Sequence, residues 1–289
     1  MGPPRPARLR LATFLALALL AAGCGNPFFS PIRGLGNPPG TERIPREDVF
    51  FASGDGVLLH GWLIPPKGGG KPKGTVLFLH GTYGNIATNL SGPAWLSEEG
   101  FTVFTFDYRG YGRSDGTPTF DGIHADARAA LELLPSLPGV APDRVAVVGQ
   151  SLGGSVAIYT VAHAHGRPAV KALVVDSAFS AYRQIVRDRM TGYPLAWLTK
   201  YPASFLFPDG YRAEEAIGRV APVPVVIIHG TDDRVVPFAH GELLFERARD
   251  PKAIWPVRGA GHGEGLSDAG IRRRLADFLE RTLAGASAP

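Results

Sequence analysis

The sequence has little cysteine and no basic segment of the kind that binds nucleic acids. Cys24 is the only cysteine among 289 residues, so an internal disulfide is excluded. The formal net charge is only +4, and no run of Lys and Arg with interleaved aromatic residues follows the N-terminal arginines. We therefore expect no nucleic-acid partner. There is also no internal repeat and no sign of a second domain, and a chain of this length with 45% hydrophobic residues fits one large domain.

The N-terminal residues have the anatomy of a secretory signal. Three arginines between residues 5 and 10 precede an apolar run over residues 11–20. A run of about ten residues is too short to span a bilayer comfortably. The sequence Leu20-Ala-Ala-Gly-Cys24 at its end resembles a bacterial lipoprotein signal, in which a cysteine after small residues becomes the lipid-modified first residue. Ala21 departs from that pattern, because lipoprotein signals most often have leucine there.

The resemblance implies that residues 1–23 are a signal peptide and that Cys24 carries lipid. The lipid would hold the protein at a membrane of the bacterial cell envelope, outside the cytoplasm. An ordinary signal peptide cleaved nearby and an uncleaved anchor are the alternatives. Residues 25–40 are rich in Gly, Pro and Asn, so we expect a flexible tether over residues 24–42. The folded domain is then expected over residues 43–289.

Short apolar strands alternate with helical segments in this domain. We expect strands at residues 49–52, 57–64, 75–79, 101–106, 145–148, 170–175, 223–228 and 253–256, and helices at residues 94–99, 124–134, 154–164, 241–249 and 271–283. The sequence Ser53-Gly-Asp-Gly56 between the first two strands is typical of a hairpin. The alternation predicts an α/β fold with a mostly parallel sheet covered by helices on both faces, and with its site at the carboxyl ends of the strands. Residues 180–211 carry scattered aromatic residues and read as irregular.

The sequence Gly149-Gln-Ser151-Leu-Gly153 lies between a predicted strand and a predicted helix. In this context a G-x-S-x-G motif predicts a nucleophilic serine on a tight, strained turn. Side chains two residues before and after Ser151 would collide with the backbone, and glycine avoids the collision. The helix that follows would place the positive end of its dipole beneath the serine oxygen. The alternative is a plain glycine turn with an idle serine.

A serine hydroxyl needs a base, which is usually a histidine oriented by a carboxylate. Among eight histidines, His262 alone follows a late strand in a glycine-flanked loop, so we predict that it is the base. If the chain order is Ser, acid, His, the acid lies between Ser151 and His262. Asp232 and Asp233 follow one predicted strand in that interval, and Asp176 follows another. Asp176 is explained more simply as a structural carboxylate that caps the next turn.

The tetrahedral intermediate of acyl transfer needs two fixed N–H donors for its oxyanion. We predict that one is the backbone N–H of Leu152, directly after the serine. The second is expected from the turn after the strand at residues 75–79, where the sequence His80-Gly-Thr82 makes the N–H of Thr82 the candidate. The His80 ring is predicted to be a hydrogen-bonded structural group. An ordinary tight turn is the alternative for this segment.

Residues 49–283 resemble the α/β-hydrolase fold, in the branch with serine-aminopeptidase-like and monoacylglycerol-lipase-like members. The segments that carry the resemblance are Leu77-Phe-Leu-His-Gly-Thr-Tyr-Gly-Asn85, Asp107-Tyr-Arg-Gly-Tyr-Gly-Arg-Ser114, Gly149-Gln-Ser-Leu-Gly153, His229-Gly-Thr-Asp-Asp233 and Gly261-His262. The resemblance implies that Asp233 is the acid, because the segment from His229 is similar to the family's H-G-x-x-D-x-x-V-P. It also implies a structural turn at residues 107–114 and a small cap at residues 180–211.

These residues together predict a serine hydrolase that cleaves a carboxylic ester, short-chain or lipid-derived, by acyl transfer. Ser151 is the expected nucleophile, His262 the base and Asp233 the acid, and no metal or organic cofactor is required. An aminopeptidase-like amide hydrolase is a weaker alternative, because no acidic cluster for a free α-amino group occurs beyond Glu214 and Glu215. A membrane-tethered binding protein without turnover is the other alternative. The oligomeric state is left open by the sequence.

Overall fold

The central sheet has eight strands in the part of the chain that the structure describes. The computed structural model describes residues 28–36, 41–164, 170–191 and 196–285. The strands are β2 (Glu47–Ala52), β3 (Leu58–Ile64), β4 (Thr75–Leu79), β6 (Thr102–Asp107), β7 (Val145–Gln150), β8 (Val170–Asp176), β9 (Val225–Gly230) and β10 (Lys252–Val257). Their order is β10-β9-β8-β7-β4-β6-β3-β2. Because only β3 runs antiparallel to its neighbours, the predicted hairpin and the mostly parallel sheet are confirmed.

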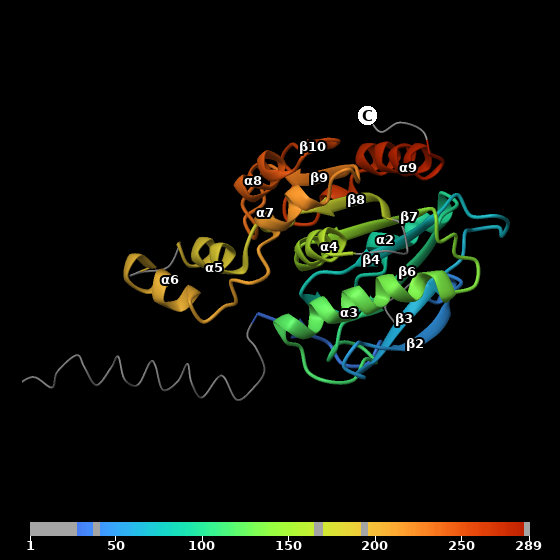
Figure 1. Ribbon diagram of the computed structural model, residues 1–289, viewed down its shortest axis with the longest axis horizontal. Coiled ribbons are helices and arrows are strands. Elements are labelled where there is room, and N and C mark those ends of the chain that lie inside the picture. The colour runs from blue at the N-terminus through green and yellow to red at the C-terminus, as the bar shows by residue number, and fades with distance from the viewer. Residues whose placement is uncertain (1–27, 37–40, 165–169, 192–195, 286–289) are drawn as a thin grey trace, which may run out of the picture.

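Helices cover both faces of this sheet (Figure 1). They are α2 (Ser91–Glu98), α3 (Phe120–Leu133), α4 (Leu152–Ala162), α5 (Tyr182–Met190), α6 (Ala196–Ser204), α7 (Ala213–Ala216), α8 (Ala239–Arg247) and α9 (Ala269–Leu283), with short 3-10 turns at Thr41–Arg43, Leu134–Ser136, Ile217–Arg219 and Gly265–Ser267. Apolar side chains of α3, α4 and α8 pack on one face, and those of α2 and α9 pack on the other. A strand buried on both faces needs apolar residues throughout, which explains the continuous runs in the sequence.

All five helices predicted from the sequence begin two to four residues earlier than expected, and α3 and α4 show two of the reasons. Helix α3 begins at Phe120, because the Thr119 side chain accepts a hydrogen bond from the Gly122 N–H and caps the first turn. Helix α4 begins at Leu152, directly after the predicted nucleophile, although two glycines in its first turn are poor helix formers. Packing against the sheet outweighs that low propensity, since Leu152 and most of the helix are buried.

Residues 28–34 differ from the expectation of a flexible tether over residues 24–42. Strand β1 (Ser30–Pro31) pairs in parallel with β5 (Tyr83–Gly84), which follows the predicted oxyanion turn. The Phe29 side chain is only 7% exposed and belongs to the apolar core. A flexible linker would bury neither a ring nor a ladder of backbone hydrogen bonds. This part of the predicted tether is therefore docked on the folded domain.

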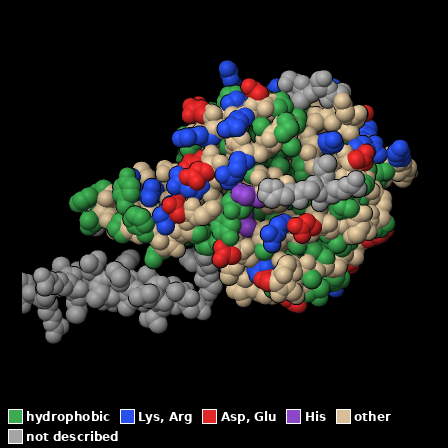
Figure 2. Space-filling model, viewed as in Figure 1, with side chains coloured by type: hydrophobic (Ala, Val, Ile, Leu, Met, Phe, Trp, Pro, Cys, Tyr) green, Lys and Arg blue, Asp and Glu red, His purple; other side chains and the backbone are tan. Residues whose placement is uncertain are grey.

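The insertion at residues 180–211 contains two helices and is not irregular as the sequence suggested. Helices α5 and α6 pack on each other and project from the side of the sheet beyond α7 (Figure 1). Their pattern was hard to recognise, because α5 has few apolar positions and α6 contains Pro202. Apolar side chains gather on the outer end of this projection, green in Figure 2. The exposed ones are Trp197, Leu198, Tyr201, Phe205 and Leu206.

The predicted signal peptide and Cys24 lie outside the described residues. Among the helices that are described, none has both the length and the apolar character needed to cross a bilayer. The lipidation of Cys24 therefore stays a prediction from the sequence.

Candidate active site

The turn from β7 to α4 carries Ser151 in a strained conformation. Its φ is 54° and its ψ is −119°, a region that residues with side chains rarely adopt. The Ser151 N–H donates to the Asp176 carbonyl at 2.8 Å, and the Ser151 carbonyl accepts from the N–H of Gly154 at 3.0 Å and of Ser155 at 3.2 Å. These bonds to a neighbouring strand end and to the first turn of α4 hold the strained backbone in place.

Glycine at positions 149 and 153 is required by the space around this turn. A Cβ on Gly149 would lie 2.3 Å from the Gly153 carbonyl oxygen, and a Cβ on Gly153 would lie 2.0 Å from the Leu79 carbonyl oxygen. Both obstacles are backbone atoms of buried segments, which cannot give way as the end of a flexible side chain could. Glycine is therefore needed at both positions for the steric reason predicted from the sequence.

We predict that Gly153→Ala lowers the free energy of unfolding by roughly 3 kcal/mol, because the turn and β4 must separate to admit the methyl group. Urea denaturation measures the change. Gly210→Ala is the matched control, since a Cβ there meets nothing within 4 Å. It should stay within about 0.5 kcal/mol of the wild type. Equal unfolding free energies for the two variants would contradict the steric account.

His262 and Asp233 reach Ser151 from two loops at the carboxyl edge of the sheet. His262 Nε2 lies 2.9 Å from Ser151 Oγ, and His262 Nδ1 lies 2.8 Å from Asp233 Oδ2. A carboxylate only accepts hydrogen bonds, so Nδ1 carries the proton of the neutral ring and Nε2 can accept the serine proton. The structure thus brings together the three residues predicted as nucleophile, base and acid, in the geometry that those roles require.

The Asp233 carboxylate is buried, and its neighbours keep it ionised. Its Oδ1 accepts hydrogen bonds from the N–H groups of Val235 and Val236, each at 2.8 Å. Burial alone would raise the pKa of this carboxyl, but the His229 and His262 rings and the backbone N–H of Val236 hold it well below its usual range. A carboxylate that stays charged at neutral pH can orient the imidazole and stabilise the imidazolium that forms during reaction.

The two other candidate acids form different hydrogen bonds. The exposed Asp232 side chain accepts from the Thr231 hydroxyl at 3.3 Å. The Asp176 carboxylate is fully buried and accepts from Gln150 Nε2 at 3.1 Å and from Ser177 Oγ at 3.2 Å. Burial raises the pKa of Asp176 above its ordinary value. In the described residues neither carboxylate is hydrogen-bonded to the predicted base, so the geometry favours Asp233.

The turn after β4 places the second predicted oxyanion donor beside the serine. A Cβ built on Gly81 would lie 3.6 Å from the Ser151 Cβ, and Thr82, Ser151 and Leu152 line one cavity. The His80 Nδ1 donates to the Gly81 carbonyl at 2.8 Å. That carbonyl and the Thr82 N–H belong to one planar peptide, so holding the carbonyl also aims the N–H.

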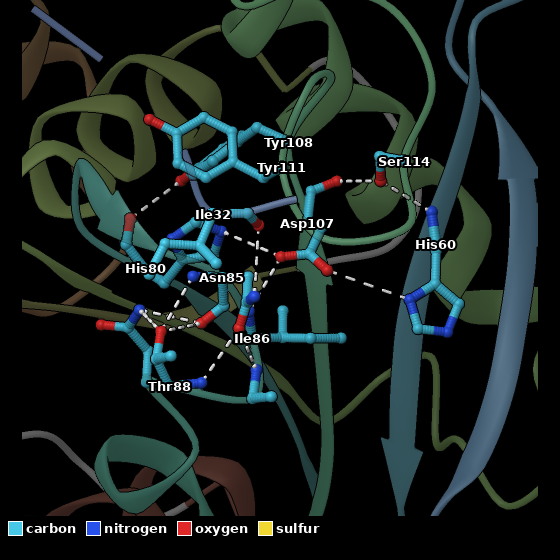
Figure 3. A network of polar contacts seen from close by, with 12 residues as sticks. Ile32, His60, His80, Asn85, Ile86, Thr88, Asp107, Tyr108, Tyr111 and Ser114 are labelled. Carbon is cyan, nitrogen blue, oxygen red and sulfur yellow. Dashed lines mark hydrogen bonds and ion pairs between the residues drawn. The ribbon is translucent and has the colours of Figure 1, made fainter. Parts of the chain in front are cut away.

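A buried polar network supports the same turn (Figure 3). The Asp107 Oδ1 accepts from the Ile86 N–H at 2.8 Å, and the Asp107 carboxylate lies 3.8 Å from His80 Nε2 and 3.9 Å from His60 Nδ1. Burial lowers the pKa of His80, so its ring is neutral near pH 7. The single ring proton is then on Nδ1, which donates to the Gly81 carbonyl. The segment at residues 107–114 therefore has the structural position expected of it.

A cavity of about 370 Å³ opens beside Ser151. It is lined by Phe28, Ser30, Thr82, Ser151, Leu152, Phe179, Ile185, Val186, Arg189, Met190, Phe207, Val235 and Val236. Apolar side chains dominate this lining, and among the described residues it contains Arg189 but no Asp or Glu. Within the described ranges, no three His, Cys, Asp or Glu side chains are grouped so that they could hold a metal ion. The apolar side chains next to Ser151 suit an apolar group, and Arg189 adds a positive charge to the cavity.

Comparison with known proteins identifies the family. The chain is 35% identical over 238 residues to the uncharacterized protein YfhR of Salmonella typhi, covering 78% of this chain and 77% of that protein. It is 36% identical over 217 residues to the uncharacterized protein Rv2307c of Mycobacterium tuberculosis, covering 75% and 72%. A family model described as alpha/beta hydrolase fold matches residues 74–213. The chain belongs to the α/β-hydrolase fold family.

Solved structures agree with this α/β-hydrolase assignment. The Pyrococcus furiosus esterase Pf2001 superposes with a TM-score of 0.69 and 25% identity, covering 90% of this chain and 99% of that one. The family and this neighbour support a hydrolase activity. The segment matched by the family model contains Thr82 and Ser151 but ends before Asp233 and His262, so the roles predicted for Asp233 and His262 depend on their geometry alone.

In this α/β-hydrolase, the residues that hold the loop of His262 were not predicted from the sequence. The Gln150 side chain donates to the Gly263 carbonyl at 3.0 Å, and the Gly263 N–H donates to Ser177 Oγ at 3.0 Å. Ser177 has a positive φ of 55°, close to the value of 54° at Ser151. A signal for both existed, because Gln150 occupies the first variable position of the G-x-S-x-G motif and Ser177 follows a strand end.

Proposed function

We propose that the protein is a serine hydrolase that cleaves a carboxylic ester by acyl transfer. The observation that carries the proposal is the chain of contacts from Ser151 Oγ to His262 at 2.9 Å and from His262 to Asp233 at 2.8 Å. An apolar cavity beside the same hydroxyl supports it, because an acyl group needs a site within reach of the nucleophile.

In the first half-reaction, Ser151 Oγ attacks the ester carbonyl carbon while His262 Nε2 takes the hydroxyl proton. The carbonyl oxygen becomes an oxyanion, which the N–H groups of Leu152 and Thr82 stabilise. The bond to the leaving oxygen then breaks, and His262 gives its proton to that oxygen. The products are a free alcohol and an acyl group esterified to Ser151.

In the second half-reaction, water takes the place of the alcohol. His262 removes a proton from the water as its oxygen attacks the acyl carbon, and the same two N–H donors stabilise the new oxyanion. When the bond to Ser151 Oγ breaks, His262 returns the proton to the serine. Ester and water are converted to acid and alcohol, and the enzyme is regenerated. Throughout, Asp233 stays ionised and orients His262.

The lining of the cavity favours an ester with an apolar acyl group. A free α-amino group, as in an aminopeptidase substrate, would need a carboxylate, whereas the described residues that line the cavity include Arg189 and no Asp or Glu. Glu214 and Glu215 both form ion pairs with Arg212 instead. We expect p-nitrophenyl esters to be hydrolysed faster than aminoacyl-arylamides in panels that vary the acyl chain. Faster cleavage of any arylamide than of every ester would overturn the ester assignment.

We also propose that Cys24 is lipid-modified and holds the enzyme at a membrane of the bacterial cell envelope. The support is the signal-like N-terminus and the run of small residues before the cysteine. Mass spectrometry of the mature protein is expected to find Cys24 as the first residue, carrying acyl chains. An unmodified Cys24 or a different first residue would overturn this proposal and leave the proposed chemistry untouched.

A further inference from the structure

Residues 28–34, which we call the strap, lie along the predicted oxyanion turn. The Thr82 hydroxyl donates to the Phe28 carbonyl at 2.6 Å, and the Ser30 N–H donates to the Thr82 carbonyl at 3.1 Å. The Tyr111 hydroxyl also donates to that carbonyl, at 2.8 Å. The strap therefore holds Thr82 through both its side chain and its carbonyl. Thr82 is also the residue whose backbone N–H is the proposed oxyanion donor.

The C-terminal end of the strap is hydrogen-bonded to the turn that follows β6. The Arg33 guanidinium donates to the carbonyls of Ser114, at 2.7 Å, and Gly116, at 2.6 Å. The Asn85 side chain donates to the Ile32 carbonyl at 3.2 Å, and both residues lie beside the buried network in Figure 3. The strap thus bridges the turns after β4 and β6, so it restricts how far the oxyanion turn can move.

The near end of the strap forms part of the cavity. Phe28 and Ser30 line it together with Ser151. The Phe28 ring lies 5.2 Å from the ring of Tyr182 and 5.9 Å from the ring of Phe207, centroid to centroid. Aromatic rings at these separations pack in favourable edge-on geometries. Phe28 is therefore held as a fixed wall of the proposed acyl site.

We propose that the strap is a positioning and specificity element of the active site. It fixes the Thr82 peptide as an oxyanion donor, and through Phe28 it limits the acyl groups that the cavity accepts. Preorganised donors need no rearrangement during reaction, and a displacement of about 1 Å can cost roughly 100-fold in rate. The inference rests on the serine hydrolase function proposed above. The strap lies before residue 74, where the match to the family model begins.

The short separation of the strap from Cys24 limits how far the proposed lipid attachment can lie from the cavity. Phe28 is four residues after Cys24. Four fully extended residues span at most about 14 Å. The point at which a lipid would be attached to Cys24 can therefore be no farther than about that distance from the backbone of Phe28. The docked strap would keep the cavity close to the membrane surface, whereas a free tether over residues 24–42 would not.

The central experiment releases the strap without altering the cavity lining. Phe29 is 7% exposed and packs in the core, and Phe29→Ala in the full chain removes this anchor. Phe51→Ala is the matched control, because Phe51 is also 7% exposed and in the same core, but on β2. The measurement is the second-order rate constant for labelling of Ser151 by a fluorophosphonate probe, which requires no knowledge of the substrate.

We expect Phe29→Ala to label roughly 10- to 100-fold more slowly than the wild type, and Phe51→Ala to stay within about twofold of it. Equal rates in the two variants would overturn the proposal. A wild type that is labelled but cleaves no ester would refute the ester assignment alone, since the labelling comparison still tests the strap. A wild type that is not labelled would overturn both.

Substitutions at Thr82 test the same proposal if Phe29→Ala does not fold. Thr82→Val removes the hydroxyl that donates to the Phe28 carbonyl, and Thr82→Ser keeps it. Both variants retain the backbone N–H. Because the Thr82 side chain also lines the cavity, changed contact with the ground-state substrate is read from KM, and a loss confined to kcat reports the position of the N–H. We expect about a tenfold lower kcat at unchanged KM for Thr82→Val and a kcat near the wild-type value for Thr82→Ser. Wild-type kcat in Thr82→Val would overturn the positioning role.

Phe28→Ala tests the wall of the acyl site. The smaller side chain should enlarge the cavity, so the ratio of kcat/KM for p-nitrophenyl hexanoate over acetate is expected to rise several-fold. A ratio equal to that of the wild type would overturn the specificity role of Phe28.

Discussion

Replacing Ser151 with alanine is expected to lower the rate of ester hydrolysis by roughly 10⁴- to 10⁶-fold. Alanine has no oxygen to attack the carbonyl, so water becomes the only nucleophile. The N–H donors and the cavity remain, and they should keep the residual rate above that of the uncatalysed reaction. The value of kcat for p-nitrophenyl acetate measures the loss, and a fluorophosphonate should label the wild type but not the variant.

Ser97→Ala is the control for removing a buried serine hydroxyl. Ser97 lies in α2, on the opposite face of the sheet from α4, and its hydroxyl donates to the Ala94 carbonyl at 2.8 Å. This variant can lose some stability but should keep the wild-type kcat and labelling. A folded wild-type protein that the probe does not label would favour the non-catalytic binding protein. Near-normal activity in Ser151→Ala would show that another residue is the nucleophile.

Much of this site could be predicted because its residues follow from local patterns and from the topology of a parallel sheet. The motif around Ser151 is a strand, a tight turn and a helix in consecutive residues, so the residues next to Ser151 are enough to predict it. Parallel strands then place their carboxyl ends at one edge. That is why His262, 111 residues after Ser151 and 29 after Asp233, could be expected beside both of them.

The strap and the helices inside the insertion at residues 180–211 could not be predicted. Helix α5 has few apolar positions and α6 contains Pro202, whereas the structure of the strap depends on distant partners. Residues 28–34 have no helical or strand periodicity, and their order comes from pairing with the two-residue strand β5 and from the contacts of Arg33 with carbonyls of another loop. The contact of Gln150 with Gly263 likewise joins residues 113 apart. A composition rich in Gly and Pro resembles that of a free linker even where tertiary contacts hold the chain.

The adjacent residues Asp232 and Asp233 are expected to differ sharply in their effect on kcat when each is replaced by asparagine. Asp233→Asn should lower kcat by about 10⁴-fold, as expected when an orienting carboxylate becomes an amide of the same shape. Asp232→Asn should leave kcat within about threefold of the wild type, because this exposed side chain bonds only the Thr231 hydroxyl among the contacts described. The kcat for one p-nitrophenyl ester, measured at pH 7 to 8 for both variants, provides the test.

The hydrogen bonds around Asp233 explain why replacing its carboxylate with an amide is expected to lower kcat so strongly. The N–H groups of Val235 and Val236 both point at Oδ1, so the oxygen of an asparagine must take that position. Its NH₂ group then occupies the position of Oδ2, 2.8 Å from His262 Nδ1, and donates to that nitrogen. The ring proton is driven to Nε2, which faces Ser151 and can no longer accept the serine proton. A large loss in Asp232→Asn with normal activity in Asp233→Asn would reverse the assignment, whereas equal losses would mean that the loop, and not one carboxylate, orients the base.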